Sequence, residues 1–357
     1  MAIIPMDNIH YNYRAINGYP QPYKFIMCCR EPGKTTNYWC DRYKNWLKNG
    51  RPSIFVVRQA VEITEEMINS ICSQSINRHI DESVCFQYKI TNMKGGTCDV
   101  KIDGKLFFRI IALSIPMQRI KKLVLNDLEN IFFDEYIIDT RNGEKYLKNE
   151  AFKIKEFYTT MIRGVPEGRP LNMYFACNPY SLFNPMFVSF GIDTEELIKH
   201  RGGFYTTNEC VIHWYLMLPE LREKLLEKNP LYKFDEDYQS YALDGMPRND
   251  KNIKISKHPN NFSLKWTIRY DTILIGIYQN NSFDPDEDSY YCEKVDEVSA
   301  NRTTYCFDFE NLVERTQLMT LNDRVRLNRF KDAMAKRKVS FESINIYYFM
   351  EEVYKML

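Results

Sequence analysis

The sequence has almost no net charge, because 48 lysine and arginine residues balance 47 aspartate and glutamate residues. This balance excludes a nucleic-acid coat protein that is basic over its whole surface, although a local basic patch is compatible with it. The ten cysteines include no Cys-x-x-Cys pair. Their scattered positions argue against a zinc site or a disulfide scaffold and favour reduced thiols inside a cell.

Signals for export or membrane insertion are also missing. Residues 1–20 have neither the basic n-region nor the long apolar h-region of a signal peptide. No run approaches the ~18 apolar residues that a membrane span requires, and the sequence has no internal repeat and no low-complexity tract. We therefore expect a soluble, intracellular protein with no membrane partner.

The composition is typical of an ordered globular protein. Of the 357 residues, 44% are hydrophobic and 27% are charged, which excludes disorder as the main state. At roughly 100–200 residues per domain, this length predicts two domains and a connector. The aromatic content of 14% favours β-rich segments with large packing surfaces.

Strands and helices alternate in the first half of the chain, which predicts a largely parallel α/β sheet over residues 1–198. The predicted strands are the apolar runs 23–29, 53–57, 130–138 and 171–177. The predicted helices are 35–47, 62–75 and 146–162. A Gly-Gly turn and an Asp-Gly turn join three further runs into an antiparallel ribbon, over 86–90, 98–102 and 106–113.

The pattern changes after residue 198. A charged helix at 220–228 and a polar, turn-rich stretch at 244–258 predict a helical connector over 199–258. A second α/β unit is expected over 259–357. Its predicted elements are a hairpin from residue 261, a strand at 303–309, a charged helix at 323–337 and an amphipathic helix at 343–355.

The strongest local signal is a strand that runs into the loop Cys28-Cys29-Arg30-Glu31-Pro32-Gly33-Lys34-Thr35. Backbone N–H groups of such a loop and of the helix that follows, which includes Thr36, can cradle the phosphates of ATP. Lys34 would reach the β and γ phosphates and the Thr35 hydroxyl would ligate Mg²⁺. Two positions depart from the usual pattern, because Cys28 replaces a glycine and Pro32 has no N–H group. A tight turn capped by Thr35 is the alternative.

The strand at 130–138 carries an acidic pair where ATP hydrolysis needs one. Asp134 would hold Mg²⁺ through water, and Glu135 would orient and deprotonate the attacking water. A strand with a solvated acidic end is the alternative for this match alone. Two such matches in this order favour an ATPase.

Three further residues are candidates for the same site. Asn178 ends the next buried strand. An Asn-Pro turn would be favoured for this match alone, but in this order after the first two motifs an amide that senses the γ-phosphate is the favoured interpretation. Arg163 and Arg169 lie between the acidic pair and Asn178. Either one could project into a neighbouring subunit's site and stabilise charge in the transition state.

Taken together, these residues resemble the DNA-packaging (encapsidation) ATPases of small Bacillus-type podophages, relatives of the large terminase motors. The likeness covers FIMCCREPGKT, LSIPMQRIKK, IFFDEYI and YFACNPYS, and it is weaker toward the C-terminus. It implies a P-loop ATPase domain of the ASCE type, a helical connector and an RNase H-like domain. It also implies a homomeric ring, usually a pentamer, docked on the portal of an empty capsid and driving double-stranded DNA inward with ATP.

The resemblance also implies roles for single residues. Lys34 and Thr35 match the phosphate-loop residues, Asp134 and Glu135 match the metal-binding and catalytic pair, and Asn178 matches a coupling residue. The trans-acting arginine falls nearest Arg163, with Arg169 as the alternative. Within the basic stretch Arg119, Lys121 and Lys122, Lys121 best fits a second trans-acting residue. The adenine would contact the region of Tyr11 and Tyr13, although aromatic packing is the more natural interpretation of those tyrosines.

The C-terminal unit is expected to be a vestigial nuclease that docks to the capsid vertex or to a scaffold RNA. An active nuclease needs several converging carboxylates, and only Asp271, Asp308 and the nearby Glu342 are candidates. The alternatives are a terminase whose metal-dependent nuclease still cuts DNA, a nucleotide-gated assembly protein that barely hydrolyses ATP, and a helicase. We expect the protein in the host cytoplasm, docked transiently at the portal vertex.

DNA contact would depend on local charge. The candidates are Lys94, Lys101 and Lys105 on the ribbon and Arg58 after the second strand, because phosphate contacts carry no sequence information. Ordinary solvated loop charges are the alternative. A second basic cluster lies on the predicted charged helix and could contact nucleic acid or an acidic portal surface: Arg324, Arg326, Arg329, Lys331, Lys336, Arg337 and Lys338.

Overall fold

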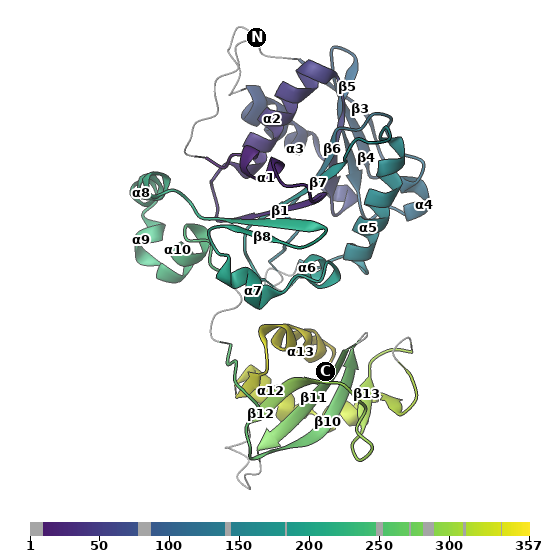
Figure 1. The fold of residues 1–357 in the computed structure, drawn as a ribbon, viewed down its shortest axis with the longest axis vertical. Coiled ribbons are helices and arrows are strands. Elements are labelled where there is room, and N and C mark those ends of the chain that lie inside the picture. Colours follow the sequence, from purple (N-terminus) through teal and green to yellow (C-terminus); the bar gives the residue numbers. More distant parts are fainter. Residues whose placement is uncertain are drawn as a thin grey trace. The chain divides into compact units, whose positions relative to one another are not determined.

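The chain divides into two compact units, Met1–Asn249 and Asp250–Leu357 (Figure 1). The structure is a computed structural model. It describes residues 10–77, 87–139, 144–182, 184–247, 253–270, 273–280, 289–309, 312–336 and 338–357.

The first unit is built on a nine-stranded sheet in the order β3-β4-β5-β2-β6-β7-β1-β9-β8. Its six central strands are parallel, which confirms the predicted α/β sheet: β5 (Lys105–Ala112), β2 (Ser53–Val57), β6 (Asn130–Asp134), β7 (Asn172–Cys177), β1 (Tyr23–Cys28) and β9 (Cys210–Tyr215). The edges are antiparallel and consist of β3 (Tyr88–Lys94) with β4 (Thr97–Ile102) on one side and β8 (Phe204–Thr206) on the other.

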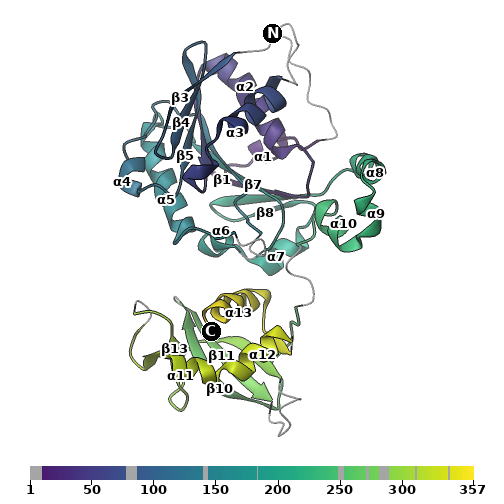
Figure 2. The same ribbon diagram turned by 180° about the vertical axis from the view of Figure 1, so that it is seen from behind.

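Helices cover both faces of this sheet, so its central strands are buried on both sides and are almost wholly apolar. Helix α2 (Lys34–Asn49) follows β1 on one face, and α5 (Glu150–Met161) joins β6 to β7 on the other (Figures 1 and 2). Right-handed crossovers in opposite directions along the sheet require opposite faces. Aromatic stacking fixes each layer, with the Tyr38 and Phe132 rings 3.9 Å apart and the Phe25 and Phe175 rings 4.4 Å apart.

Shorter helices complete the first unit. A helix predicted over 62–75 begins as α3 (Glu65–Asn69) and continues as a π-helical segment, Ser70–Ile76. The others near the sheet are α1 (Arg14–Asn17), α4 (Met117–Ile120), α6 (Pro185–Ser189) and α7 (Thr194–Lys199).

The segment predicted as a helical connector has a different structure in its first part. Residues 204–215 form β8 and β9, and β9 pairs with β1 along its whole length, from Tyr23 opposite Cys210 to Cys28 opposite Tyr215. The connector expected from residue 199 is therefore wrong for these two strands, because they complete the sheet. Three helices follow and enclose a small core with Cys29: α8 (Pro219–Lys228), α9 (Leu231–Phe234) and α10 (Glu236–Ala242).

The second unit contains a six-stranded sheet in the order β14-β13-β10-β11-β12-β15. The strands β10 (Phe262–Tyr270), β11 (Ile273–Asn280) and β12 (Tyr290–Val295) are antiparallel. Parallel pairs extend them on both sides through β13 (Thr304–Cys306), β14 (Thr316–Leu318) and β15 (Val339–Phe341). An antiparallel meander continued by parallel strands agrees with the RNase H-like fold that the resemblance implies.

The helices of the second unit correct one prediction. The single charged helix expected over 323–337 is two helices, α11 (Leu321–Arg326) and α12 (Asn328–Ala335). Leu327 separates them, with ψ near zero and a side chain that is fully buried. The last helix, α13 (Ile344–Met356), agrees with the prediction. Among the described helices of both units, none is long and apolar enough to cross a membrane.

Candidate nucleotide-binding site

The predicted phosphate loop joins β1 to α2, and its backbone explains why Cys28 is tolerated. Cys28 is the last residue of β1 and is fully buried. The left-handed positions of the loop are Glu31, with φ 65°, and Gly33, with φ 72°. A side chain on Gly33 would also lie 3.3 Å from the ring of His10. The turn therefore requires a glycine at position 33 and not at position 28.

Lys34 and Asn178 meet across this loop. Lys34 is the first residue of α2, and its Nζ donates a hydrogen bond to Oδ1 of Asn178 at 2.7 Å. Asn178 follows β7, the strand next to β1. Burial lowers the pKa of Lys34, but Cys28 and Asp134 raise it more, so its pKa is above the usual value. The ammonium group therefore stays charged at the entrance to the helix.

Thr35 and Asp134 form a second contact in the same place. The Thr35 hydroxyl donates to Oδ2 of Asp134 at 2.5 Å, and Asp134 ends β6, opposite Ala176 of β7. A hydroxyl and a carboxylate are the hard oxygen ligands that Mg²⁺ prefers, so this donor set fits the ion. Burial raises the pKa of Asp134. The structure thus brings the lysine, the threonine, the aspartate and the asparagine together at the carboxyl ends of three neighbouring strands.

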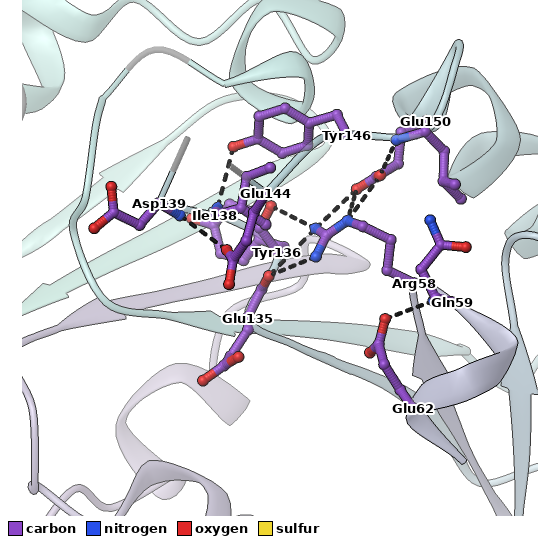
Figure 3. Close-up of polar contacts among 11 residues, drawn as sticks. Arg58, Gln59, Glu62, Glu135, Tyr136, Ile138, Asp139, Glu144, Tyr146 and Glu150 are labelled. Atoms are coloured by element: carbon purple, nitrogen blue, oxygen red, sulfur yellow. Dashed lines mark hydrogen bonds and ion pairs between the residues drawn. The ribbon is translucent and has the colours of Figure 1, made fainter. Parts of the chain in front are cut away.

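Glu135 adopts a left-handed backbone, with φ 53°, and this ends β6 earlier than the sequence predicts. Its carbonyl oxygen accepts hydrogen bonds from both Nη atoms of Arg58 at 3.3 Å, and the carbonyl of Tyr136 accepts one at 3.2 Å. In Figure 3 the Glu135 carboxylate points away from the guanidinium. Burial and the nearby Asp134 raise the pKa of Glu135, as is usual for a general base.

The prediction that Arg58 contacts DNA is wrong. Arg58 is only 8% exposed, and its guanidinium donates to both oxygens of the buried Glu150 carboxylate at 2.9 to 3.1 Å. The rings of Phe133 and Tyr146 flank it, with centroids 5.3 and 5.5 Å from Cζ. Arg58 therefore supports the residues that follow β6 and has no surface to offer a ligand.

The side chains of Arg30 and Glu31 turn toward the helices after β9. Arg30 Nη2 donates to the Tyr180 hydroxyl at 3.1 Å, and the Arg30 N–H group donates to the carbonyl of Ala242 at 2.9 Å. The Tyr232 hydroxyl donates to Glu31 at 3.4 Å. The side chains of these two loop residues and the N–H group of Arg30 are therefore engaged within the chain. In the first turn of α2 the Thr36 hydroxyl lies 3.4 Å from that of Ser75.

The two candidate trans-acting arginines lie away from this site. Arg163 is exposed in the short 3₁₀ turn after α5, and Lys121 is exposed at the end of α4. Arg169 precedes β7 and is held by its own chain, through Asp127 at 2.6 Å and the carbonyl of Leu128 at 2.7 Å. Helix α5 runs back from the carboxyl end of β6 to the start of β7. Both arginines are therefore at the amino ends of the parallel strands, whereas Glu135 is at their carboxyl ends.

Tyr11 and Tyr13 are buried, at 1% and 2% exposure, so neither ring has a face free for a base. The Tyr11 N–H group donates to the carbonyl of Pro32, and Asn37 of α2 donates to the carbonyl of Tyr11, both at 2.8 Å. The geometry supports the packing interpretation of these tyrosines. Their segment holds the phosphate loop against the sheet.

The carboxylates considered for a nuclease do not converge. Asp308 follows β13, whereas Glu342 follows β15 and accepts a hydrogen bond from the Lys294 N–H group. Three strands, β10, β11 and β12, separate β13 from β15, so at about 4.8 Å per strand these groups are on the order of 19 Å apart. Asp271 lies outside the described residues. Within the ranges that the structure describes, no cluster of three His, Cys, Asp or Glu residues could hold a metal.

Two of the ribbon lysines remain candidates for DNA contact. Lys105 is exposed at the start of β5 and Lys101 is half-buried on β4. The side chain of Lys94 and the whole of Arg337 lie outside what the structure describes. Among the basic residues of α11 and α12, Arg326 and Arg329 are exposed.

The fold and the site define a P-loop α/β domain followed by a second α/β domain with an RNase H-like sheet. A model of the family described as "Podovirus DNA encapsidation protein (Gp16)" matches residues 6–357. The chain belongs to this family of podovirus DNA encapsidation proteins. No curated protein sequence matches it.

Two solved structures share the whole fold. A chain of the bacteriophage Phi-29 viral genome packaging motor assembly is 18% identical, with a TM-score of 0.69 over 98% of this chain and 99% of that one. The Phi-28 gp11 DNA packaging motor is 19% identical, with a TM-score of 0.63 over 98% of both chains. At these identities the likeness shows the fold, and the family match extends along nearly the whole chain.

Proposed function

We propose that this chain is the ATPase of a viral DNA-packaging motor, which couples ATP hydrolysis to the movement of double-stranded DNA through a portal into a procapsid. The observation that carries the proposal is the pair of contacts Lys34–Asn178 and Thr35–Asp134, at 2.7 and 2.5 Å, beside Glu135. Membership of a DNA encapsidation family supports the assignment of this ATP hydrolysis to DNA packaging.

Each residue of the site has a distinct role in hydrolysis. Backbone N–H groups of the loop and of the first turn of α2 bind the phosphates, and Lys34 neutralises charge on the β and γ phosphates. Thr35 and Asp134 would hold Mg²⁺, which neutralises developing phosphate charge when it is bound. Glu135 accepts a proton from the attacking water as the water oxygen bonds to the γ-phosphorus and the bond to the bridging oxygen breaks.

Asn178 connects hydrolysis to the rest of the domain. Its amide oxygen accepts from Lys34, and Tyr180, two residues on, accepts from Arg30 of the phosphate loop. When Lys34 turns to a phosphate, Asn178 loses this partner, and its amide NH₂ group can turn to donate to the γ-phosphate. The position of the segment after β7 then depends on the nucleotide state.

Completion of the site calls for a second copy of the chain. Arg163 is exposed at the edge of the sheet opposite Glu135, whereas Arg169 is paired with Asp127. We therefore assign the trans-acting arginine to Arg163, with Lys121 as a second basic residue. This arrangement requires a ring, which we propose is a homopentamer docked at the portal in the host cytoplasm, with a scaffold RNA as a further partner.

Two other functions are less well supported. A cutting terminase would need clustered carboxylates, but Asp308 and Glu342 flank opposite sides of the meander, and β10 reads FSLKWTIRY with no acidic residue. We therefore propose a non-cleaving domain. A nucleotide-gated switch has little use for a carboxylate at this position, on a segment whose backbone carbonyl is held by a dedicated arginine.

Steady-state ATP hydrolysis with and without double-stranded DNA tests the proposal. DNA should stimulate the wild-type protein, and Glu135→Gln should lower turnover by about 100- to 10,000-fold, because the general base is lost. Glu167→Gln makes the same change at an exposed residue and should have no effect. Hydrolysis by wild type that is indifferent to DNA, both free and docked on procapsids, would contradict a translocating motor.

A further inference from the structure

One guanidinium joins the start of α5 to the catalytic segment. Arg58 donates to the Glu150 carboxylate through Nε and Nη2, and the same group donates to the carbonyls of Glu135 and Tyr136. Figure 3 shows the guanidinium between these two sets of acceptors. Glu150 is the first residue of α5 and is only 1% exposed. The position of this helix and the backbone of Glu135 are therefore set by a single side chain.

Glu150 is also the group that organises the beginning of the helix. Asn149, the N-cap residue, has a left-handed backbone with φ 54° and makes no side-chain capping bond. The Glu150 carboxylate instead accepts from the Leu147 N–H group at 2.8 Å. Its other hydrogen bonds in this buried position come from Arg58, the cation that pairs with it, so movement of Arg58 would move the start of α5.

The other end of α5 carries Arg163. The helix has 12 residues, so at 1.5 Å per residue it is about 18 Å long, and the turn Ile162–Gly164 follows it directly. The carbonyl of Gly164 accepts from the Asp127 N–H group at 2.8 Å, and a Cβ at Gly164 would lie 2.0 Å from the carbonyl oxygen of Leu125. This close backbone packing seats the turn before β6, the strand that ends in Asp134.

The body of the helix is suited to transmit a displacement. Its inner face is fully buried through Ile154, Phe157 and Met161, and a packed helix of this kind shifts as a unit rather than bending locally. A shift of the segment at Glu135 and Tyr136 would thus displace Arg163, because α5 moves as a rigid unit. The exposed residues of the helix need not rearrange.

We propose that Glu150 is a positioning residue that, through Arg58, links the state of a subunit's own Glu135 segment to the placement of the Arg163 that it offers to a neighbouring copy. The proposal rests on the proposed function, because it takes Arg163 as the trans-acting arginine. It adds that α5 carries information from one active site to the next. A subunit presents its arginine correctly only while Glu150 is held.

Rings of two variants separate this link from a subunit's own catalysis. A donor with Glu135→Gln cannot hydrolyse ATP but retains Arg163. An acceptor with Arg163→Ala retains its own site but offers no arginine. Mixed on procapsids with double-stranded DNA, the pair should regain hydrolysis at least about 10-fold above either variant alone, since donor arginines complete acceptor sites.

The decisive donor carries Glu135→Gln together with Glu150→Gln. Its own site is already inactive, so a further loss reports only on the arginine it presents. We expect restored activity to fall about 5-fold or more. A donor with Glu135→Gln and Glu156→Gln has the same change at a half-buried residue of α5 outside the network, and it should complement fully. Glu150→Asp, which keeps the charge but shortens the side chain, should give an intermediate value.

Each result bears on one claim. Full complementation by the Glu150→Gln donor, with unchanged incorporation into rings, would overturn the link while the trans-acting role of Arg163 stands. No complementation by the simple Glu135→Gln donor would overturn the role of Arg163, and this inference with it. If the Glu150→Gln donor does not fold, the Glu150→Asp donor decides the question, because complementation equal to that of the reference donor again contradicts the link.

Discussion

The two sheets of this protein belong to the same α/β class but place their polar residues very differently. In the first unit, β1, β7 and β6 are parallel neighbours, so the residues that follow them meet at one edge. In the second unit an antiparallel meander separates the strands that precede Asp308 and Glu342. Topology, rather than the number of acidic residues, decides which unit brings its candidate metal-binding and nucleotide-binding residues together.

The same contrast holds for buried charge. The first unit contains the Arg58–Glu150 pair, with side chains 10% and 0% exposed, directly behind the site. In the second unit the Arg326–Asp323 pair has a 72% exposed arginine and lies on one short helix. A buried pair of this kind is costly to assemble and even more costly to break. The buried Arg58–Glu150 pair therefore marks the first unit as the one in which the backbone around the site is held in a fixed position.

Among the substitutions that compare the two units, the largest effect should come from Lys34. Lys34→Ala removes the charge that faces the phosphates, and we expect ATP hydrolysis to fall about 100- to 1,000-fold. Steady-state phosphate release measures this. Lys336→Ala removes an exposed lysine of the second unit and is the matched control. Equal losses in both variants would mean that the two units do not differ as described.

Arg58→Ala should strongly lower the free energy of unfolding of the first unit. It leaves the Glu150 carboxylate buried and unpaired, which costs about 3–5 kcal/mol of the free energy of unfolding. Urea unfolding followed by tryptophan fluorescence in a Trp266→Phe background measures the first unit, because the remaining tryptophans are all in it.

Arg326→Ala is the comparison in the second unit. Because Arg326 is exposed and the buried Asp323 keeps its hydrogen bonds from Thr320 and Tyr305, we expect a change below about 1 kcal/mol. The measurement is the tryptophan-fluorescence transition that is lost in the Trp266→Phe background. A cost for Arg58→Ala that is no greater than this would contradict the account of a geometry held by buried charge.

A smaller effect should appear with pH. Burial lowers the pKa of His213 on β9 to about 4 from 6.5, so the unfolded chain binds a proton that the folded chain refuses. The free energy of unfolding of the first unit should therefore be constant above about pH 7 and fall as the pH drops from 6.5 toward 4. Urea unfolding at a series of pH values measures this. His213→Gln should flatten that dependence, and an unchanged slope in this variant would assign it to other groups.

The smallest effect is expected in the second unit. Asp308→Asn and Glu342→Gln should leave plasmid DNA cleavage in Mg²⁺ or Mn²⁺ unchanged from the wild-type background, because these carboxylates cannot share an ion at their separation. Gel analysis of supercoiled plasmid measures this. Cleavage by wild type that either substitution abolishes would show that the second unit has a metal site after all.

Residues that act next to one another in the sequence were predictable. Gly33, Lys34 and Thr35 form the phosphate loop as a contiguous motif, and Asp134 with Glu135 ends an apolar strand. The relation of the two motifs followed from strand order, since parallel strands bring their carboxyl ends to one edge. The predicted runs likewise located seven of the central and ribbon strands.

The supporting residues were not predictable, because their contacts depend on the folded chain. Arg58 and Glu150 are 92 positions apart, and no local pattern distinguishes a buried arginine after a strand from an exposed one. The strand β9 was missed for a different reason: its run CVIHWY is apolar, but it lies within the stretch assigned to a connector, and its pairing with β1 identifies it. The left-handed backbone of Glu135 also required the fold, because nothing in the sequence ends that strand at residue 134.

Protection of DNA inside procapsids tests the central claim most directly. Purified procapsids, double-stranded DNA and ATP are incubated with the wild-type protein or with Glu135→Gln, and DNA that survives nuclease treatment is measured. The account predicts protected DNA of genome length with wild type and none with Glu135→Gln. Protected DNA in equal amount with the variant, or hydrolysis by wild type without protected DNA, would contradict a motor driven by this site.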